Sequence, residues 1–143
     1  MKRIARCILQ NKEGKIILVR HKGKNIWVMP GGHIENKENI YDAIKREIKE
    51  ELGISIKIMG KKLGLELKNV KEMPLPITIY KIDYINKKGK KEKRLEYIFL
   101  AKIKSDIIKT QIEEIEEYKW FEKCEIEELK NTYEQIKDLV KLI

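Results

Sequence analysis

The sequence predicts an α+β fold in which helices pack on a mixed β-sheet. Short runs of β-branched and aliphatic residues precede and separate two segments whose apolar residues recur every three to four positions. The first pattern is typical of strands and the second of amphipathic helices. With 143 residues, the chain is long enough for one hydrophobic core of ordinary size, so residues 1–143 are expected to form a single domain.

Two strands are expected at the start of the chain, at residues 4–9 and 15–20, which are rich in β-branched and aliphatic side chains. The segment between them, residues 11–14, reads Asn-Lys-Glu-Gly. Because Asn and Gly accept the backbone conformations of tight turns, this segment is expected to join the two strands as a hairpin.

A helix is expected to follow the Gly-Gly pair at residues 31–32. Asn39 is a suitable N-cap with Asp42 three residues on, as in a capping box, and Gly53 can take the left-handed conformation that ends a helix. Apolar residues recur at every fourth position, at Ile40, Ile44, Ile48 and Leu52. One side of the helix is therefore expected to be buried, and the opposite side, which carries glutamates, is expected to face outward.

The rest of the chain alternates between strand and helix patterns. Further strands are expected at residues 54–59, 76–85 and 94–104, and the basic run at residues 87–94 is expected to form a hairpin tip. A final helix is expected at residues 132–143. Its apolar stripe consists of Ile136, Leu139, Val140 and Ile143.

Three glutamates lie close together on the predicted first helix. Counted from Glu47, Glu50 lies about 300° and Glu51 about 40° around the helix axis, so the three carboxylates fall within an arc of roughly 100°. Carboxylates crowded in this way repel one another unless a cation lies between them. Hard oxygen ligands suit Mg²⁺ or Mn²⁺, which bridge to substrate phosphates. The segment is therefore predicted to bind one of these metals.

Residues 32–54 resemble the Nudix box, in which Gly, five residues, Glu and seven residues precede Arg-Glu-U-x-Glu-Glu-x-Gly-U, with U aliphatic. Every fixed position is matched, by Gly32, Glu38, Arg46, Glu47, Ile48, Glu50, Glu51, Gly53 and Ile54. The preceding Trp-Val-Met-Pro-Gly-Gly at residues 27–32 is similar to the lead-in of that family. A lone glycine-rich loop would mean little, but nine matched positions are a strong signal.

The resemblance implies an α/β/α sandwich around a mixed sheet and a role for each residue of the box. The three helix carboxylates would bind the metal, and the backbone carbonyl of Gly32 or its neighbour would add a ligand. Arg46 stays protonated and can pair with two carboxylates, so it is expected to hold the glutamates in place together with Glu38. A carboxylate, with Glu47 and Glu50 as candidates, or the metal would activate the attacking water, and which of them does so stays open.

Family enzymes often add a glutamate from a later loop, and the sequence offers several candidates. A Glu followed by five residues and Trp is common in the family, and Glu114 and Trp120 match that spacing. Glu114 is therefore the preferred additional metal ligand and catalytic residue, followed by Glu117 and then Glu113. An acidic turn without a role in the site is the alternative. Trp120 and Phe121 are expected in the core.

The chemistry that the resemblance implies is hydrolysis of a nucleoside diphosphate linked to another moiety, with Mg²⁺ or Mn²⁺. The Pro and Tyr that mark enzymes for ADP-ribose and diadenosine polyphosphates do not occur at residues 68–72. The favoured substrate is therefore a nucleoside triphosphate, oxidised or not, hydrolysed to the monophosphate and pyrophosphate. The alternatives are another conjugate, such as ADP-ribose, a dinucleoside polyphosphate or an RNA 5′ end, and a non-catalytic nucleotide- or RNA-binding module.

Three residues near the box are candidates for substrate binding. Arg20 and Lys22, with Lys24 close by, precede the Trp of the lead-in, where a phosphate tail could pass, and His33 directly follows the second glycine of the loop. For Arg20, Lys22 and His33 alike, an ordinary surface or structural role is the alternative.

The net charge of +9 is unevenly distributed. Residues 1–110 carry 27 Lys and Arg against 13 Asp and Glu, whereas residues 111–143 carry 5 against 10. An excess of positive charge, as in residues 1–110, attracts polyphosphate or nucleic acid. Because the lysines are dispersed among isoleucines and glutamates, a nucleotide is favoured over nucleic acid as the partner.

The remaining observations concern the environment of the protein. The N-terminal segment, residues 1–9, is too short and too charged for a signal peptide or membrane span, so a cytoplasmic protein with no membrane partner is expected. Cys7 and Cys124 have no His near them in sequence, so neither a zinc site nor a disulfide is expected. The sequence leaves the oligomeric state open.

Overall fold

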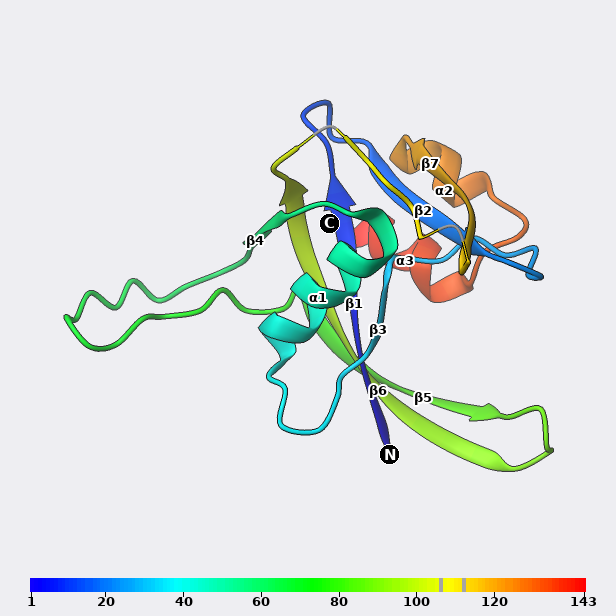
Figure 1. The fold of residues 1–143 in the computed structure, drawn as a ribbon, viewed down its shortest axis with the longest axis horizontal. Helices are drawn as coiled ribbons and strands as arrows, with labels where there is room; N and C mark the ends of the chain where they lie inside the picture. The colour runs from blue at the N-terminus through cyan, green and yellow to red at the C-terminus, as the bar shows by residue number, and fades with distance from the viewer. Residues whose placement is uncertain (106, 112) are drawn as a thin grey trace.

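A computed structural model describes residues 1–143 except residues 106 and 112. The strands of the described chain are β1 (Lys2–Gln10), β2 (Ile16–His21), β3 (Gly31–His33), β4 (Ile56–Met59), β5 (Thr78–Ile85), β6 (Lys91–Ile103) and β7 (Ile115–Phe121). The helices are α1 (Ile40–Leu52), α2 (Lys123–Glu128) and α3 (Glu134–Leu142). Figure 1 shows their arrangement.

The strands form one mixed sheet, which confirms the predicted α+β fold. Its main path runs β4-β6-β1-β2-β7, while β3 pairs with β1 and β5 pairs with β6. β1 and β6 are parallel neighbours at the centre, in register from Lys2 opposite Arg94 to Gln10 opposite Lys102. The other pairings are antiparallel. The sheet thus brings residues from both halves of the chain side by side.

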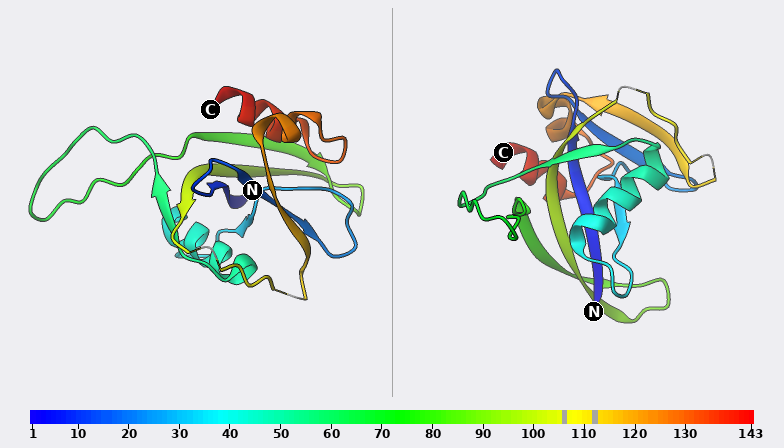
Figure 2. Two further views of the ribbon diagram at one scale, coloured as in Figure 1. Left: turned by 90° about the horizontal axis from the view of Figure 1, so that it is seen from above. Right: turned by 60° about the vertical axis from the view of Figure 1, so that its left-hand side comes forward.

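Helices cover both faces of the sheet, and the view from above shows α1 on one side and α2 and α3 on the other (Figure 2). Ile44 and Ile48 of α1 are fully buried in one core together with Cys7 of β1. Ile136 of α3 lies in the other core with Ile8. Cys7 and Ile8 belong to different cores because successive strand residues point to opposite faces. This layering is the α/β/α sandwich that the resemblance implied.

Helix α1 begins and ends where its capping residues predict. The Asn39 side-chain oxygen accepts the Asp42 backbone N–H at 2.9 Å, and Gly53 is left-handed at φ 68°. The N–H of Gly53 donates to the Lys49 carbonyl at 2.9 Å. The Asp42 carboxylate accepts the Asn39 side-chain amide at 2.9 Å, whereas in a full capping box it would accept the backbone N–H of the cap.

Several later elements differ from the prediction in extent. Strand β4 begins two residues later than expected, β5 begins at Thr78, and β6 runs three residues further toward its N-terminus. Helix α3 begins at Glu134 because Thr132 is held against the core, where its hydroxyl donates to the Trp27 carbonyl at 2.7 Å. Ile143, expected on the apolar stripe, is 39% exposed. The tip of the β5–β6 hairpin lies at residues 86–90, so residues 91–94 of the basic run belong to strand β6.

Three features of the fold were not expected. The short strand β3 and the six-residue helix α2 had no prediction, and residues 115–121, in the segment where a loop was considered, form strand β7 paired with β2. The prediction that Trp120 and Phe121 lie in the core is largely confirmed. Phe121 is buried in the core that contains Ile8, and Trp120 is partly buried against the core that contains Cys7.

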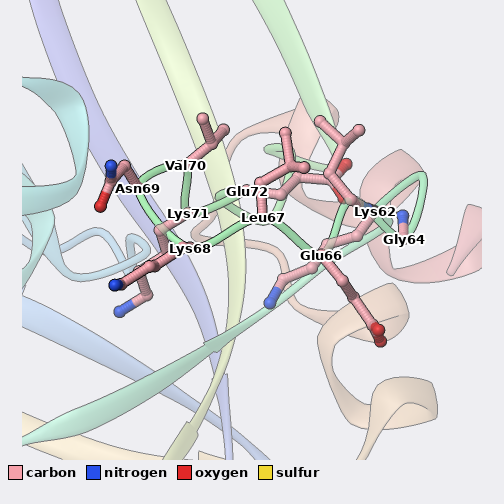
Figure 3. A pocket seen from close by; sticks show the side chains of 10 residues that line it. Lys62, Gly64, Glu66, Leu67, Lys68, Asn69, Val70, Lys71 and Glu72 are labelled. Atoms are coloured by element: carbon pink, nitrogen blue, oxygen red, sulfur yellow. Dashed lines mark hydrogen bonds between the residues drawn. The ribbon is translucent and has the colours of Figure 1, made fainter.

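Residues 60–77, between β4 and β5, form an arm that projects from the sheet (Figure 1). The arm is organised by its own contacts, because the Glu72 carboxylate accepts backbone N–H groups of Leu63, Gly64 and Leu65. Its leucines are exposed, with Leu63 at 93%. A hollow at its end is lined by arm residues alone (Figure 3).

No helix in the described part of the chain combines the length and the apolar character that are needed to cross a bilayer.

Candidate active site

The Gly-Gly loop is fixed between the sheet and helix α1. Strand β3 pairs with β1, which places Gly31 opposite Arg6 and Gly32 opposite Ala5. A β-carbon on Gly31, at φ 147°, would lie 2.1 Å from the Ala5 carbonyl oxygen, and one on Gly32 would lie 2.5 Å from the Glu47 carboxylate. The backbone of β1 therefore excludes a β-carbon at Gly31, and the Glu47 side chain of α1 opposes one at Gly32.

Arg46 holds three of the predicted residues together. Its Nε and Nη2 donate to the two carboxylate oxygens of Glu38, at 2.7 and 2.9 Å, and its Nη1 donates to Glu47 at 2.9 Å. Nη1 also lies 3.3 Å from Glu50, and Nη2 donates to the His33 carbonyl at 2.9 Å. These hydrogen bonds lower the pKa of Glu38 to about 2. Arg46 thus links the helix carboxylates to the loop.

The three helix carboxylates differ in exposure, so the expectation that the glutamate side faces outward is wrong for one of them. Glu50 is exposed and Glu47 is partly buried, but Glu51 is only 2% exposed. The carboxylate of Glu51 accepts the Gly31 N–H at 2.7 Å, and its other oxygen lies 2.9 Å from Nε2 of His21. Because a buried carboxylate needs polar partners, these contacts explain how α1 turns this side chain inward.

The carboxylates of the box are suitable ligands for a divalent cation, although they do not yet surround a common point. Across residues 1–105, 107–111 and 113–143, no three acidic, His or Cys side chains already converge as a metal cluster. Glu47 and Glu50 instead share Arg46 as their partner, whereas Glu51 is held by the Gly31 N–H and by His21. The three carboxylates nevertheless come from neighbouring turns of one helix, and the loop approaches Glu47 so closely that a β-carbon on Gly32 would displace its carboxylate. Hard oxygen donors in this arrangement fit Mg²⁺ or Mn²⁺.

The segment before β7 lies beside the C-terminal end of α1. The Gln111 N–H donates to the Glu51 carbonyl at 3.0 Å, and the Lys22 N–H donates to the Glu114 carbonyl at 2.9 Å. Glu113 and Glu114 are exposed, while Glu117 pairs with Arg20 at 3.3 Å. Backbone contacts therefore bring Glu114 to this end of the helix, but its side chain does not join the helix carboxylates in a cluster within the described residues.

A cavity of about 290 Å³ opens beside the Gly-Gly loop. His33 and Lys24 line it, whereas Arg20 and Lys22 lie outside its lining. The Arg20 guanidinium is bound by Glu117 and by the Lys24 carbonyl, which it meets at 3.3 Å. Burial lowers the pKa of His33, and nearby positive charges lower it further. The cavity is therefore a cationic environment.

A buried carboxylate that sequence reasoning missed lies under this cavity. Glu96 of β6 is 1% exposed. Its Oε1 accepts Nε of Arg6 and the Tyr80 hydroxyl, both at 3.2 Å, and its Oε2 pairs with Nε of Arg94 at 2.9 Å. Both arginines also line the cavity. The charged residues at alternate positions of the expected strand, Arg94 and Glu96, were a signal for a shared face, but their partner Arg6 is 90 residues away from Glu96.

Comparison with known proteins gives one family. A model of the NUDIX domain matches residues 1–142. An RNA pyrophosphohydrolase from Pelagibacter ubique is 28% identical over 144 residues, which are 95% of this chain and 89% of that protein. The crystal structure of a NUDIX family hydrolase from Clostridium perfringens matches with a TM-score of 0.74 and 22% identity, covering 98% of this chain and 96% of that one.

Other relatives match over shorter stretches of this chain. An 8-oxo-dGTP diphosphatase from Buchnera aphidicola is 49% identical over 43 residues, which are 29% of this chain and 35% of that protein. In this relative and in six other curated relatives, the match to this chain spans between 22% and 37% of their own length.

Proposed function

The chain belongs to the NUDIX domain family, and from this premise we propose that it is a hydrolase that converts a nucleoside triphosphate to the monophosphate and pyrophosphate with Mg²⁺ or Mn²⁺. The observation that carries the proposal is the arrangement of Glu47, Glu50 and Glu51 around Arg46 and the Gly-Gly loop, next to a cationic cavity. The carboxylates favour a cation, and the cavity favours an anionic substrate beside it.

The residues of the box have different proposed roles in such a site. The three carboxylates, with the Gly32 carbonyl, would hold the metal, which when bound polarises a phosphoryl group and neutralises the leaving pyrophosphate. Arg46 and Glu38 orient these ligands through the bidentate pair described above. Glu47 and Glu50 are the candidates for accepting the proton of the attacking water. Glu114, on the segment beside α1, is the candidate for an additional ligand.

An RNA 5′ end is the second candidate substrate. It is supported by the Pelagibacter ubique relative named as an RNA pyrophosphohydrolase, which aligns with 95% of this chain, and by the excess of Lys and Arg in residues 1–110. Both candidates present phosphates to the same cationic cavity. A non-catalytic binding module is less favoured, because such a module does not require all of the acidic residues that this box retains.

The test is release of phosphate and pyrophosphate from a panel of substrates, with Mg²⁺ and with chelator. The panel contains nucleoside triphosphates, oxidised nucleotides, ADP-ribose, dinucleoside polyphosphates and RNA with triphosphate or capped 5′ ends. Chelator-sensitive pyrophosphate release from a free triphosphate supports the proposal, and preferential release from RNA supports the second candidate. A folded protein that binds Mn²⁺ and turns over nothing in the panel contradicts both.

A further inference from the structure

Two arginines share one buried carboxylate at the side of the cavity. Nε of Arg6 lies 3.2 Å from one oxygen of Glu96, and Nε of Arg94 lies 2.9 Å from the other. The side chain of Glu96 is 2% exposed, and those of Arg6 and Arg94 are 17% and 23% exposed. Burying three charges with only one negative partner is costly unless a further anion is available. The cluster therefore has an unbalanced positive charge.

The contacts of the two guanidiniums leave donors available. Among the described residues, Arg6 uses its Nε for Glu96 and its Nη1 for the Met29 carbonyl at 3.1 Å. Arg94 is held by Glu96 and by the ring of Tyr84, whose centroid lies 5.0 Å from its Cζ. A guanidinium carries five N–H donors. Both side chains are thus held in place and keep N–H groups for a ligand.

The sheet places this pair next to the proposed metal site. Arg6 lies opposite Gly31 in the β1–β3 pairing, and both arginines line the same 290 Å³ cavity as Gly31 and Gly32. Lys24 and His33 line it too. A ligand that lies in the cavity can therefore extend from the loop to the arginines.

We propose that Arg6 and Arg94 bind a phosphate of the substrate other than those engaged at the box carboxylates. The planar fork of arginine matches the oxygens of a phosphate, and two forks with a net positive charge match its charge better than they match a neutral base. The phosphate is either the outer one of a 5′-triphosphate or the 3′-phosphodiester of an RNA end. Glu96 is a positioning residue that holds the two arginines, and Tyr80 holds Glu96 through its hydroxyl. This inference rests on the proposed function and adds to it a preference for an extra phosphate.

The test measures binding without turnover. Wild type, Arg94→Gln and Arg94→Lys are titrated with ATP, ADP, adenosine and the dinucleotide pppApA in chelator, by calorimetry. The matched control is Lys93→Gln, which changes the same charge on the neighbouring exposed residue of β6, where side chains alternate between faces. Arg94→Lys keeps the positive charge but lacks the planar pair of N–H donors of a guanidinium. It replaces Arg94→Gln in the test if Arg94→Gln does not fold.

The expected result is a loss of about tenfold to a hundredfold in affinity for the phosphorylated ligand in Arg94→Gln. A smaller loss is expected in Arg94→Lys, and none in Lys93→Gln. A loss seen with ATP but not ADP assigns the outer phosphate, and a loss confined to pppApA assigns the 3′-phosphodiester. Equal affinities in wild type and Arg94→Gln for every ligand would overturn the inference. Because no step of this test needs catalysis, arginine-dependent binding by a protein that hydrolyses nothing would reject the proposed function alone.

Discussion

Gly31 and Gly32 exclude a β-carbon for different physical reasons, which predicts different effects of the same substitution. In Gly31→Ala the new methyl would meet the backbone of β1, which cannot move without breaking the sheet, so a loss of about 3 kcal/mol or more in the free energy of unfolding is expected. In Gly32→Ala it would meet only the end of the flexible Glu47 side chain. A loss below about 1 kcal/mol is expected there.

Gly32→Ala should instead impair the site, because the displaced Glu47 carboxylate leaves its place between Arg46 and the loop. A fall in hydrolysis of about tenfold to a hundredfold is expected, since small displacements of catalytic groups are costly. Urea unfolding and pyrophosphate release, measured on both variants, check the two expectations. Full activity in Gly32→Ala, or equal destabilisation by both substitutions, would contradict this account of the loop.

The Glu38–Arg46 pair predicts how stability depends on pH. The pKa of Glu38 is lowered from 4.5 to about 2 by the Arg46 hydrogen bonds. A lowered pKa in the folded state stabilises the protein above the unfolded-state pKa, and this stabilisation is lost as pH falls from about 5 to about 2. Glu38→Gln should therefore cost about 1 kcal/mol at pH 7, where the pair is partly exposed to solvent.

The measurement is urea unfolding of wild type and Glu38→Gln in chelator between pH 7 and pH 2. The difference in the free energy of unfolding between the two proteins is expected to shrink as the pH falls. Glu66→Gln, on the arm, serves as a control that should not differ from wild type. A difference that stays constant across this range would show that Glu38 acts through packing and not through its charge.

At the residue scale, the sequence predicted contacts between near neighbours and missed those between distant ones. Arg46 and Glu38 are eight positions apart, and their pairing was predicted and is present. His21 contacts Glu51 across 30 positions and Arg6 contacts Glu96 across 90. Neither contact has a local pattern, because the first depends on how α1 packs beside β2 and the second on the pairing of β1 with β6.

At the element scale, the predictions were most accurate where local signals mark both ends of an element. Helix α1 has a side-chain cap at Asn39 and a left-handed glycine at its end, and both are confirmed. Strand β3 has three residues and α2 has six, which is too short for a periodic pattern. Strand β7 contains charged residues at Glu116, Glu117 and Lys119, so its composition indicated a loop although its backbone pairs with β2.

Residues 62–73 of the arm belong to neither core, and their removal is expected to be tolerated. The two ends of the arm meet where the Leu75 N–H donates to the Lys61 carbonyl at 3.1 Å. Replacing residues 62–73 with a short Gly-Ser linker shortens a loop and keeps the Pro74 carbonyl, which accepts the Tyr41 hydroxyl at 2.7 Å. Tm is expected to change by less than about 4 °C, because loop length contributes only slightly to stability.

Thermal unfolding and pyrophosphate release of this shortened chain check the expectation. Hydrolysis should stay within about twofold of wild type, since no arm residue lines the 290 Å³ cavity. A loss of activity with unchanged Tm would contradict this expectation and would mean that the arm contributes to substrate binding or turnover.

At the scale of the whole molecule, the α+β class followed from two apolar helix faces and a set of strands, and the α/β/α layering followed from the family resemblance. The order of the strands followed from neither. The parallel pairing of β1 with β6 joins segments about 90 residues apart, and a single sequence has no pattern that specifies such a register. The cationic cavity depends on this pairing, because it brings Arg6 beside Glu96 and Arg94. The box was therefore predictable from the sequence, whereas the cationic cavity beside it was not.

Metal binding is expected to stabilise the whole molecule, because the three carboxylates and the Gly32 carbonyl come together only in the folded chain. Free Mn²⁺ at about 100 times its dissociation constant would add about 2.7 kcal/mol to the free energy of unfolding. For a chain of this size that corresponds to a rise in Tm of about 5–10 °C. The rise is measured by thermal unfolding with Mn²⁺ and with chelator.

Glu50→Gln separates this effect from general charge effects. Glu50 is exposed, so the variant should have the wild-type Tm in chelator, but it should lose most of the rise with Mn²⁺ and nearly all Mg²⁺-dependent turnover. Glu128→Gln removes the same charge from an exposed position of α2, on the other side of the sheet, and should behave as wild type in both measurements. An equal Mn²⁺-induced rise in Glu50→Gln and wild type, or turnover that survives in Glu50→Gln, would show that the metal binds elsewhere, because the most exposed of the three box carboxylates would then not be a ligand.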